Sequence, residues 1–252
     1  MNDNRTDLVM LHGWGMNSAV WGALLSALGG RLKPVPIDLP GHGDEPFDAA
    51  LRWLPHWADD CLRRAPDHAI WLGWSLGGMV AIQAALQAPK RVHALVLMGA
   101  TPRFVQAVDW RAAVAEETLV QFGDGLRDDP DAVLDRFLAL QVRGSSEARA
   151  TLRKLRGELA RRPAPDPEAL SAGLDILREE DLRGPLPDLT MPALWLFGDR
   201  DTLVPSPVAE RVSLLTHQAR TRVIGGAAHA AFLSHTETVV GEINAFLDGT
   251  AQ

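Results

Sequence analysis

The chain of 252 residues contains a single cysteine, Cys61, so it cannot form a disulfide within itself. It also lacks any apolar run long enough to span a bilayer, and its polar start at residues 1–7 has no apolar signal-peptide core. Together these absences predict a soluble cytoplasmic protein, because a lone cysteine suits a reducing compartment. Cys61 has no acid–base pair close by in the sequence, which indicates a packing role rather than a nucleophile.

Positive charge is also scarce, since 25 Lys and Arg residues face 32 Asp and Glu residues for a net charge of -7. An acidic balance argues against a nucleic-acid binder. No cluster of His, Cys, Asp and Glu residues has the spacing of a metal site, so we expect neither a metal nor an organic cofactor. No apolar helix face or edge strand is left over in the pattern, which predicts a monomer.

Short apolar segments alternate with amphipathic ones, a pattern typical of a mainly parallel sheet flanked by helices. We expect strands at residues 8–11, 34–37, 69–74, 94–98, 193–197 and 221–224, and helices at 21–28, 53–65, 78–86 and 239–247. Prolines at positions 34 and 36 place the second strand near an edge of the sheet or make it short.

Residues 108–186 interrupt this alternation between the fourth and fifth expected strands. They are helical in pattern, rich in Arg and Ala, and broken by the Pro-Ala-Pro-Asp-Pro run at 163–167. A connection of this length with its own helices is a subdomain rather than a loop. We expect a cap over the C-terminal edge of the sheet, where open α/β sheets bind ligands, on a core of residues 1–107 and 187–252. A structural subdomain away from the site is the alternative.

The stretch Gly73-Trp74-Ser75-Leu76-Gly77 stands between an expected strand and an expected helix. Glycines two residues before and after Ser75 leave room where Cβ atoms would otherwise collide, so the serine can adopt a strained backbone and point out of the sheet. This is the G-x-S-x-G pattern of a nucleophile elbow in the context that it requires. Ser75 is therefore the predicted nucleophile.

A serine hydroxyl needs a base within hydrogen-bond reach, and in this architecture the partners follow in the order serine, acid, histidine. Asp201, in the loop after the fifth strand, is the expected acid, with Asp199 as the alternative and otherwise a turn-forming carboxylate. His229 is the expected base, because small residues let its loop fold close to the serine. His235 is its rival, in a segment that reads as a helix N-cap region.

The segment His12-Gly13-Trp14-Gly15 follows the first expected strand, where this architecture builds half of an oxyanion hole. The negative oxygen of a tetrahedral intermediate can be held by two backbone N–H groups. We expect these groups to belong to Leu76, which follows the nucleophile, and to Trp14. His12 is expected to fix this loop rather than to transfer protons, and the turn at residues 38–43 to be structural.

Three separated motifs in this order make the chain resemble the α/β-hydrolase superfamily over nearly its full length, which implies the α/β-hydrolase fold. Within it, the chain is most similar to the biotin-pathway carboxylesterases. The similarity rests on LHGWGMN at 11–17, IWLGWSLGG at 70–78, RFLALQ at 136–141 and AAHA at 227–230. Many relatives have an extra β-hairpin before the His-Gly strand, but only seven residues precede Leu8, so we expect a shorter sheet at that edge.

The resemblance implies a serine esterase that hydrolyses the methyl ester of a pimeloyl chain borne by acyl carrier protein. Its triad positions match Ser75, Asp201 and His229. The positions implied to contact the substrate match Trp14, Ser75, Leu76, Phe137, Leu138, Ala139, Leu140, Gln141 and His229. Neither a metal nor a membrane is implied.

Arginines gather in the expected cap of this otherwise acidic chain. Arg149 and Arg153 are spaced i, i+4 and so share a helix face, and Arg136 belongs to the same segment. Because carrier proteins are acidic, the resemblance implies that such a face docks the carrier, more weakly as salt rises. A solvated helix surface is the alternative.

Other functions share part of this pattern. The serine at the elbow argues against the dehalogenases and epoxide hydrolases of this fold, which use aspartate there. A broad-specificity short-chain carboxylesterase, a thioesterase or a carbon–carbon bond hydrolase would keep the triad and differ in the cap pocket. A non-catalytic ligand receptor of the same fold is disfavoured by the complete triad and both oxyanion positions.

Overall fold

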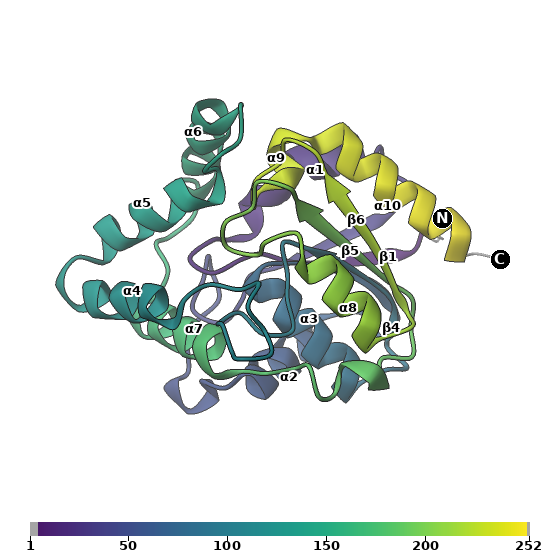
Figure 1. The fold of residues 1–252 in the computed structure, drawn as a ribbon, viewed down its shortest axis with the longest axis horizontal. Helices are drawn as coiled ribbons and strands as arrows, with labels where there is room; N and C mark the ends of the chain where they lie inside the picture. Colours follow the sequence, from purple (N-terminus) through teal and green to yellow (C-terminus); the bar gives the residue numbers. More distant parts are fainter. Residues whose placement is uncertain (1–4, 251–252) are drawn as a thin grey trace.

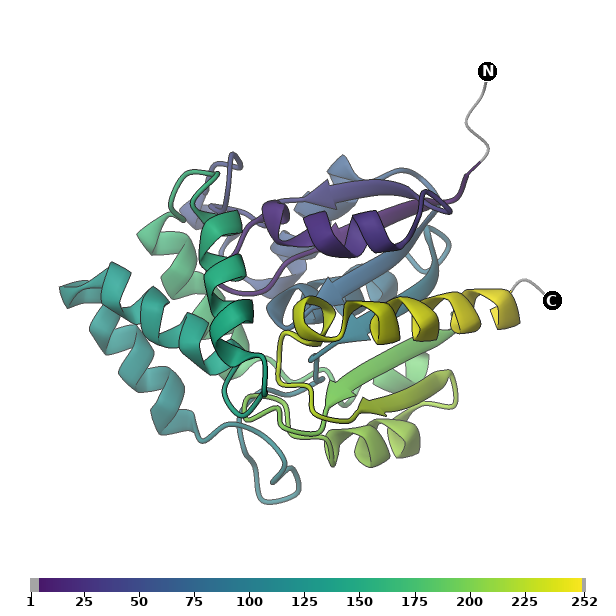
Figure 2. The ribbon, with the colours of Figure 1, turned by 90° about the horizontal axis from the view of Figure 1, so that it is seen from above.

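The computed structural model describes residues 5–250 of the chain. A single sheet lies between two layers of helices, and a further group of helices stands beyond one end of the strands (Figures 1 and 2). The polar start on which the localisation prediction rests includes residues 1–4, which lie outside the described residues.

Within residues 5–250 the sheet has six strands, all parallel, in the order β2-β1-β3-β4-β5-β6. Their bounds are β1 (Asp7–Leu11), β2 (Lys33–Ile37), β3 (Ala69–Trp74), β4 (Val92–Met98), β5 (Ala193–Gly198) and β6 (Ala219–Ile224). The four central strands are almost wholly buried and apolar, because helices cover both faces of a parallel sheet. The predicted parallel sheet is confirmed, and the proline-containing β2 lies at its edge.

Helices of the core cover the sheet on both faces (Figure 1). One face carries α1 (Gly22–Ala27), α9 (Ala231–Ser234) and α10 (Thr236–Thr250), and the other carries α2 (Leu54–Arg64), α3 (Leu76–Gln87) and α8 (Val208–Leu215). Short 3₁₀ turns occupy Ser18–Trp21, Ala49–Leu51 and Leu186–Asp188. The sequence pattern predicts α1, α2, α3 and α10 but not α8 and α9.

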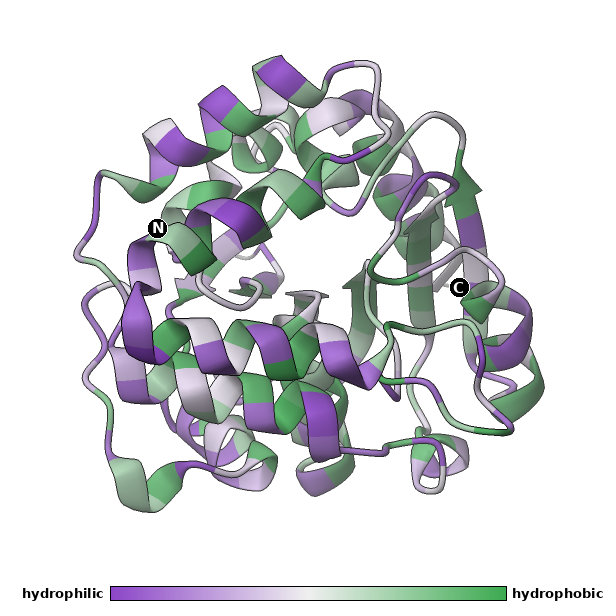
Figure 3. Ribbon diagram, turned by 60° about the vertical axis from the view of Figure 1, so that its left-hand side comes forward, coloured by the Kyte–Doolittle hydropathy of each residue, from purple (hydrophilic) through white to green (hydrophobic). Residues whose placement is uncertain are grey.

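Four helices lie between β4 and β5 in the described chain: α4 (Glu116–Asp128), α5 (Pro130–Gln141), α6 (Ala148–Leu159) and α7 (Pro167–Glu179). We call them the cap helices. They stand together beyond the C-terminal ends of the strands, as Figure 2 shows. In Figure 3 their residues alternate between hydrophilic and hydrophobic, whereas the central strands are mostly hydrophobic, as expected of helices with one face in solvent.

The cap helices are tied to the loops that follow β1 and β2. The Asp166 amide donates to the Gly41 carbonyl at 2.8 Å, and the Asn17 side-chain amide donates to the Leu159 carbonyl at 3.3 Å. Arg162 forms ion pairs with Asp38, at 3.3 Å, and with Asp44. The cap helices are thus connected to the core by hydrogen bonds and charge as well as by apolar packing.

Cys61 is fully buried in α2, and this burial raises the pKa of its thiol to about 12. A buried thiol that stays protonated is a small apolar packing group rather than a nucleophile.

Among residues 5–250, no helix combines the length and the apolar character that crossing a membrane would require.

Candidate active site

Ser75 occupies the sharp turn between β3 and α3. Its backbone has φ 57° and ψ -121°, and it is the one non-glycine residue with positive φ in the described part of the chain. The turn is held by hydrogen bonds from the Ser75 amide to the Met98 carbonyl, at 3.0 Å, and from the Gly78 amide to the Ser75 carbonyl, at 2.9 Å. Such a conformation is strained and persists only where its surroundings enforce it.

The two flanking glycines permit a close approach of backbones. A Cβ atom on Gly73 would collide with the backbone of Gly77, and one on Gly77 would collide with the carbonyl oxygens of Leu11 and His12. The start of α3 is therefore pressed against the end of β1. This contact places the serine beside the loop that follows β1, as a nucleophile elbow requires.

Asp201 and His229 come from the loops after β5 and β6 and meet in a buried pair. Asp201 Oδ2 accepts a hydrogen bond from His229 Nδ1 at 2.7 Å, and both side chains are fully buried. The other carboxylate oxygen accepts from the amides of Leu203 and Val204 at 2.8 and 2.9 Å. Asp201 is thus held on both oxygens, with one of them fixing the orientation of the imidazole.

The His229 loop is clamped from two sides. The Trp74 indole Nε1 donates to the His229 carbonyl at 3.1 Å, and its ring packs edge-on against Phe232, with centroids 4.9 Å apart. From the cap, the carbonyl of Gln141 accepts a hydrogen bond from the Ala230 amide at 3.1 Å. The position of the histidine is therefore set jointly by the elbow and by the end of α5.

Ser75 Oγ and His229 Nε2 are both buried and have no hydrogen-bond partner within residues 5–250. Buried polar atoms in native proteins are nearly always paired, so such an exception asks for a functional reason. Because Nδ1 of His229 is engaged with Asp201, Nε2 is the nitrogen free to accept a proton. An unpaired hydroxyl and an unpaired imidazole nitrogen are what an acyl-transfer site offers to its substrate.

The rival residues lie outside this group. Asp199 is exposed, and its Oδ1 accepts a hydrogen bond from the Gly226 amide at 2.7 Å, which is the turn-forming contact considered as its alternative. His235 lies at the junction of α9 and α10, where its Nδ1 pairs with the Ser234 hydroxyl at 2.8 Å. Neither contacts the Asp201–His229 pair through a hydrogen bond.

The amides of Trp14 and Leu76 point to no acceptor within the described chain, as an oxyanion hole would require. His12 holds the Trp14 loop: its Nδ1 donates to the Gly13 carbonyl at 2.8 Å and its Nε2 accepts from the Leu39 amide at 3.0 Å. Burial keeps the pKa of His12 well below its usual value, and the nearby His42 lowers it further. His12 is therefore a neutral loop-fixing residue.

His42 fixes the same loop from the other side. Its Nε2 accepts from the Gly15 amide at 3.3 Å and its Nδ1 donates to the Pro40 carbonyl at 2.9 Å, while burial lowers its pKa to about 4. The turn after β2 thus acts structurally, by holding residues 12–15, the segment predicted to form half of an oxyanion hole, which we call the oxyanion loop.

Trp14 is also held from the cap side. Its indole Nε1 donates to the Leu170 carbonyl at 2.8 Å, and its ring packs edge-on against Phe137 with centroids 4.7 Å apart. Phe122 lies 6.5 Å from the same ring. The cap helices α4, α5 and α7 therefore all contact Trp14, whose amide is one of the two predicted oxyanion donors.

The residues of the α5 string differ in their placement. Phe137, Leu138 and Gln141 are buried, Leu140 is half-buried, and Ala139 is exposed. Phe137 and Gln141, one turn apart, face Trp14 and the His229 loop respectively. The structure does not bring the exposed Ala139 to these groups, because a helix turns it to the outer side.

Leu170, Gly173 and the indole hydrogen bond of Trp74 are features that the sequence analysis missed. A Cβ atom on Gly173 would lie 2.7 Å from Trp14 Cδ1 and 3.2 Å from Leu76 Cδ2. The sequence carried a signal for Gly173, because a glycine inside an amphipathic helix weakens the helix and so indicates that close packing requires it.

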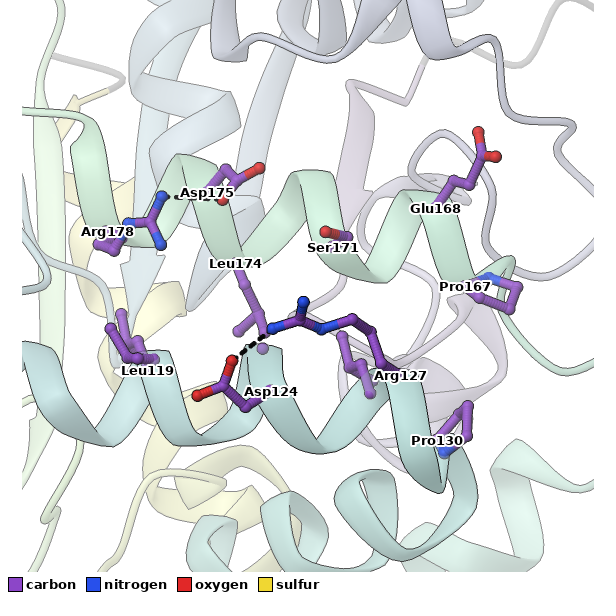
Figure 4. A pocket seen from close by; sticks show the side chains of 13 residues that line it. Leu119, Asp124, Arg127, Pro130, Pro167, Glu168, Ser171, Leu174, Asp175 and Arg178 are labelled. Carbon is purple, nitrogen blue, oxygen red and sulfur yellow. Dashed lines mark hydrogen bonds and ion pairs between the residues drawn. The ribbon is translucent and has the colours of Figure 1, made fainter.

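A surface cavity of about 640 Å³ lies between α4 and α7 (Figure 4). Its lining includes the ion pairs Asp124–Arg127 and Asp175–Arg178 but none of the predicted triad or oxyanion residues. Ser75 and His229 are closed off from solvent, since they are 1% and 2% exposed. In residues 5–250, no three His, Cys, Asp or Glu side chains are grouped to hold a metal ion.

Comparison with known proteins places these features in a family context. The model of the alpha/beta hydrolase fold family matches residues 7–236. A pimeloyl-[acyl-carrier protein] methyl ester esterase of Photobacterium profundum is 43% identical over 242 residues, spanning 96% of this chain and 94% of that protein. A protein of the same name from Xanthomonas oryzae pv. oryzae is 42% identical over 240 residues, spanning 95% and 94%.

Among solved structures, an esterase from Exiguobacterium antarcticum superposes with a TM-score of 0.87 at 21% identity, covering 96% of this chain and 92% of that one. The enol-lactonase from Burkholderia xenovorans superposes with a TM-score of 0.83 at 18% identity, covering 97% and 92%. At these identities the similarity shows the shared fold.

The two aspartates of the β5 loop should respond differently to substitution. Asp201→Asn removes the charge that orients and stabilises the imidazole, and we expect kcat for a p-nitrophenyl ester to fall by about 10⁴-fold. Asp199→Asn leaves the pair intact and should change kcat by less than about tenfold, because it alters only an exposed turn contact. Steady-state kinetics of both variants test this, and a larger loss for Asp199→Asn would reverse the assignment.

Proposed function

We propose that this chain, which belongs to the α/β-hydrolase fold family and within it to the pimeloyl-[acyl-carrier protein] methyl ester esterases, hydrolyses the methyl ester of pimeloyl-acyl carrier protein. The products are methanol and pimeloyl-acyl carrier protein with a free carboxylate, used in the biotin pathway. The observation that carries the proposal is the buried Asp201–His229 pair, whose loop is bonded to Trp74 next to Ser75, together with the unpaired atoms Ser75 Oγ and His229 Nε2.

The first step is acyl transfer to the enzyme. Ser75 Oγ attacks the ester carbonyl while His229 Nε2 takes its proton, and Asp201 stabilises the resulting imidazolium through Nδ1. Collapse of the tetrahedral intermediate breaks the bond to the methoxy oxygen, which leaves as methanol with the proton from Nε2. The acyl group is then esterified to Ser75.

The second step repeats the chemistry with water. His229 takes a proton from a water molecule as the water attacks the acyl-enzyme, and returns that proton to Ser75 Oγ when the acid leaves. In both steps the amides of Trp14 and Leu76 hold the negative oxygen of the tetrahedral intermediate. The chain's own residues supply every proton transfer in this scheme.

The division of labour follows the two parts of the chain. We assign residues 1–107 and 187–252 to the catalytic core and residues 108–186 to the cap, since the cap helices all fall within 116–179. Trp14, Ser75, Leu76 and His229 contact the reacting ester, and Phe137, Leu138, Leu140 and Gln141 line the path of the acyl chain. Each buried methylene of that chain contributes about 0.8 kcal/mol. Ala139, the remaining residue of this string, is exposed and does not line this path.

Removal of the nucleophile tests the mechanism. Ser75→Ala lacks the attacking oxygen, so hydrolysis of the carrier-bound methyl ester should fall by at least about 10⁴-fold. Mass spectrometry of the carrier protein follows the loss of one methyl group directly. Full esterase activity in Ser75→Ala would refute the mechanism.

The same proposal is tested in cells, where the wild-type gene should restore growth without biotin to a strain that lacks its own esterase. Ser75→Ala is the matched control and should not restore growth.

A broad-specificity short-chain carboxylesterase or a thioesterase would use the same triad. Turnover of p-nitrophenyl esters of graded chain length separates these cases, because a short-chain esterase prefers acetyl and butyryl esters. A non-catalytic receptor of the same fold would turn over none of them.

Docking of the carrier protein is the proposed role of α6. Arg149, Arg153 and Lys154 are exposed and form no ion pair within residues 5–250. Other cap arginines are neutralised, since Arg156 pairs with Asp135 and Arg161 with Glu158. Arg136 is also exposed and lies over the Phe122 ring at 5.2 Å. Unpaired cations on an acidic protein are available to an acidic partner, which the paired ones are not.

Charge reversal tests the docking face. The double variant Arg149→Glu/Arg153→Glu should raise KM for the carrier-bound ester by about tenfold or more and leave a small p-nitrophenyl ester unaffected, because steering acts only on the charged carrier. Lys90→Glu/Arg211→Glu is the matched control: it changes the net charge equally at exposed residues outside the cap. Equal losses on both substrates, or in both double variants, would exclude docking by α6.

We further propose that the protein is a cytoplasmic monomer. Among residues 5–250, the exposed large apolar side chains come from separate segments of the chain, and they are Trp53, Val108, Val120, Leu214 and Val223. Light scattering of the purified protein should give the mass of one chain, and a dimer mass would contradict this.

A further inference from the structure

Gly173 lies inside α7, where a glycine makes the helix less stable than an alanine would. It is buried, and a Cβ atom at this position would lie 2.7 Å from Trp14 Cδ1, 3.2 Å from Trp14 Nε1 and 3.2 Å from Leu76 Cδ2. The first of these distances is shorter than protein packing tolerates. The backbone of α7 therefore touches the side chains of both residues whose amides form the oxyanion hole.

A hydrogen bond reinforces this contact one turn earlier in α7. The Leu170 carbonyl accepts from the Trp14 indole Nε1 at 2.8 Å, in a fully buried position. Phe137 of α5 packs edge-on against the same indole, with ring centroids 4.7 Å apart. The indole is thus in contact with two cap helices, α5 and α7.

The oxyanion loop is held differently on its core side. His12 and His42 bind the backbone at Gly13 and Gly15, on either side of Trp14. These contacts fix the ends of the loop, but neither reaches the Trp14 side chain or Leu76. By contrast, α7 lies against the side chains of both donor residues at Gly173.

We infer that Gly173, together with the Leu170 carbonyl, is a positioning element that aligns the Trp14 and Leu76 amides for the tetrahedral intermediate. The inference rests on the proposed function only in taking these two amides as the oxyanion donors of a serine esterase. The cap then has a part in the chemistry itself, because the hole is aligned only while α7 is seated on the core. The cavity of Figure 4 is not involved, since neither Gly173 nor Leu170 lines it.

Two matched glycine variants test the steric part. Gly173→Ala places a methyl group against Trp14, whereas Gly157→Ala in α6 meets no atom within 4 Å. Loss of one oxyanion donor costs about 10²–10³-fold in turnover, so a displaced donor should lower kcat for p-nitrophenyl butyrate by about 10–100-fold. KM should stay within about twofold, since the donors act mainly on the transition state. Gly157→Ala should match the wild type.

Binding of a transition-state analogue separates positioning from a merely structural role. An alkylboronic acid forms a tetrahedral adduct with Ser75 whose hydroxyl occupies the oxyanion hole. Its affinity for Gly173→Ala should fall by about the same factor as kcat/KM. A variant that is only less stable would show a lower Tm with unchanged boronic acid affinity and kcat per folded molecule.

Two tryptophan variants test the hydrogen bond and remain informative if Gly173→Ala does not fold. Trp14→Phe removes the donor to Leu170, whereas Trp195→Phe in β5 removes a buried indole N–H that has no partner in the described chain. Trp14→Phe should lower kcat and boronic acid affinity together, and Trp195→Phe should change neither beyond about twofold. In the double variant Gly173→Ala/Trp14→Phe, the loss should be smaller than the product of the single losses, because both act through one indole.

Wild-type kcat and boronic acid affinity in Gly173→Ala, or losses that simply multiply in the double variant, would overturn the inference. So would equal losses in Trp14→Phe and Trp195→Phe. Failure of the proposed substrate gives a different result: the wild type would hydrolyse p-nitrophenyl butyrate and bind the boronic acid but leave the carrier-bound methyl ester intact. A wild type without any ester hydrolysis would overturn both.

Discussion

Ser75 holds a backbone conformation that costs on the order of 1–3 kcal/mol, and the strands around it supply the contacts that maintain it. The hydrogen bond from its amide to Met98 joins it to β4, and the close contact of Gly77 with the end of β1 joins it to the oxyanion loop. The strained turn therefore lies at the meeting point of three neighbouring strands. Its geometry decides where the hydroxyl points and how near the Leu76 amide lies to the Trp14 amide.

The parallel sheet accounts for the rest of the assembly on the core side. Neighbouring parallel strands end at the same edge, so the loops after β5 and β6 lie side by side there. This regularity is why Asp201 and His229 could be paired from their order in the sequence alone. Strand order does not separate them from Asp199 and His235, which lie in the same two loops or just beyond them. The contacts make that distinction, because Asp199 accepts from the Gly226 amide and His235 pairs with Ser234, whereas Asp201 and His229 bond to each other.

The cap side could be predicted only in outline. The helical pattern of residues 108–186 indicates helices, but it does not reveal that Trp14 bonds to Leu170, 156 residues away, or that Trp74 bonds to the carbonyl of His229. These contacts depend on how helices pack on the core, which local sequence patterns do not encode. For the same reason the sequence alone cannot tell unpaired arginines such as Arg149 from paired ones such as Arg156. The helices α8 and α9, of 8 and 4 residues, were also not predicted from the sequence pattern.

The cap leaves the sheet after β4 and returns at β5, and these two strands are direct neighbours in the parallel sheet. A segment that departs and returns one strand apart can be exchanged in evolution without changing the register of any strand. The cap helices and the turn at Ser75 can then be inherited separately. A donor cap would still have to present a small residue to Trp14 and Leu76, and a carbonyl to the indole. Because of this requirement, only a cap that keeps these two contacts can replace the present one.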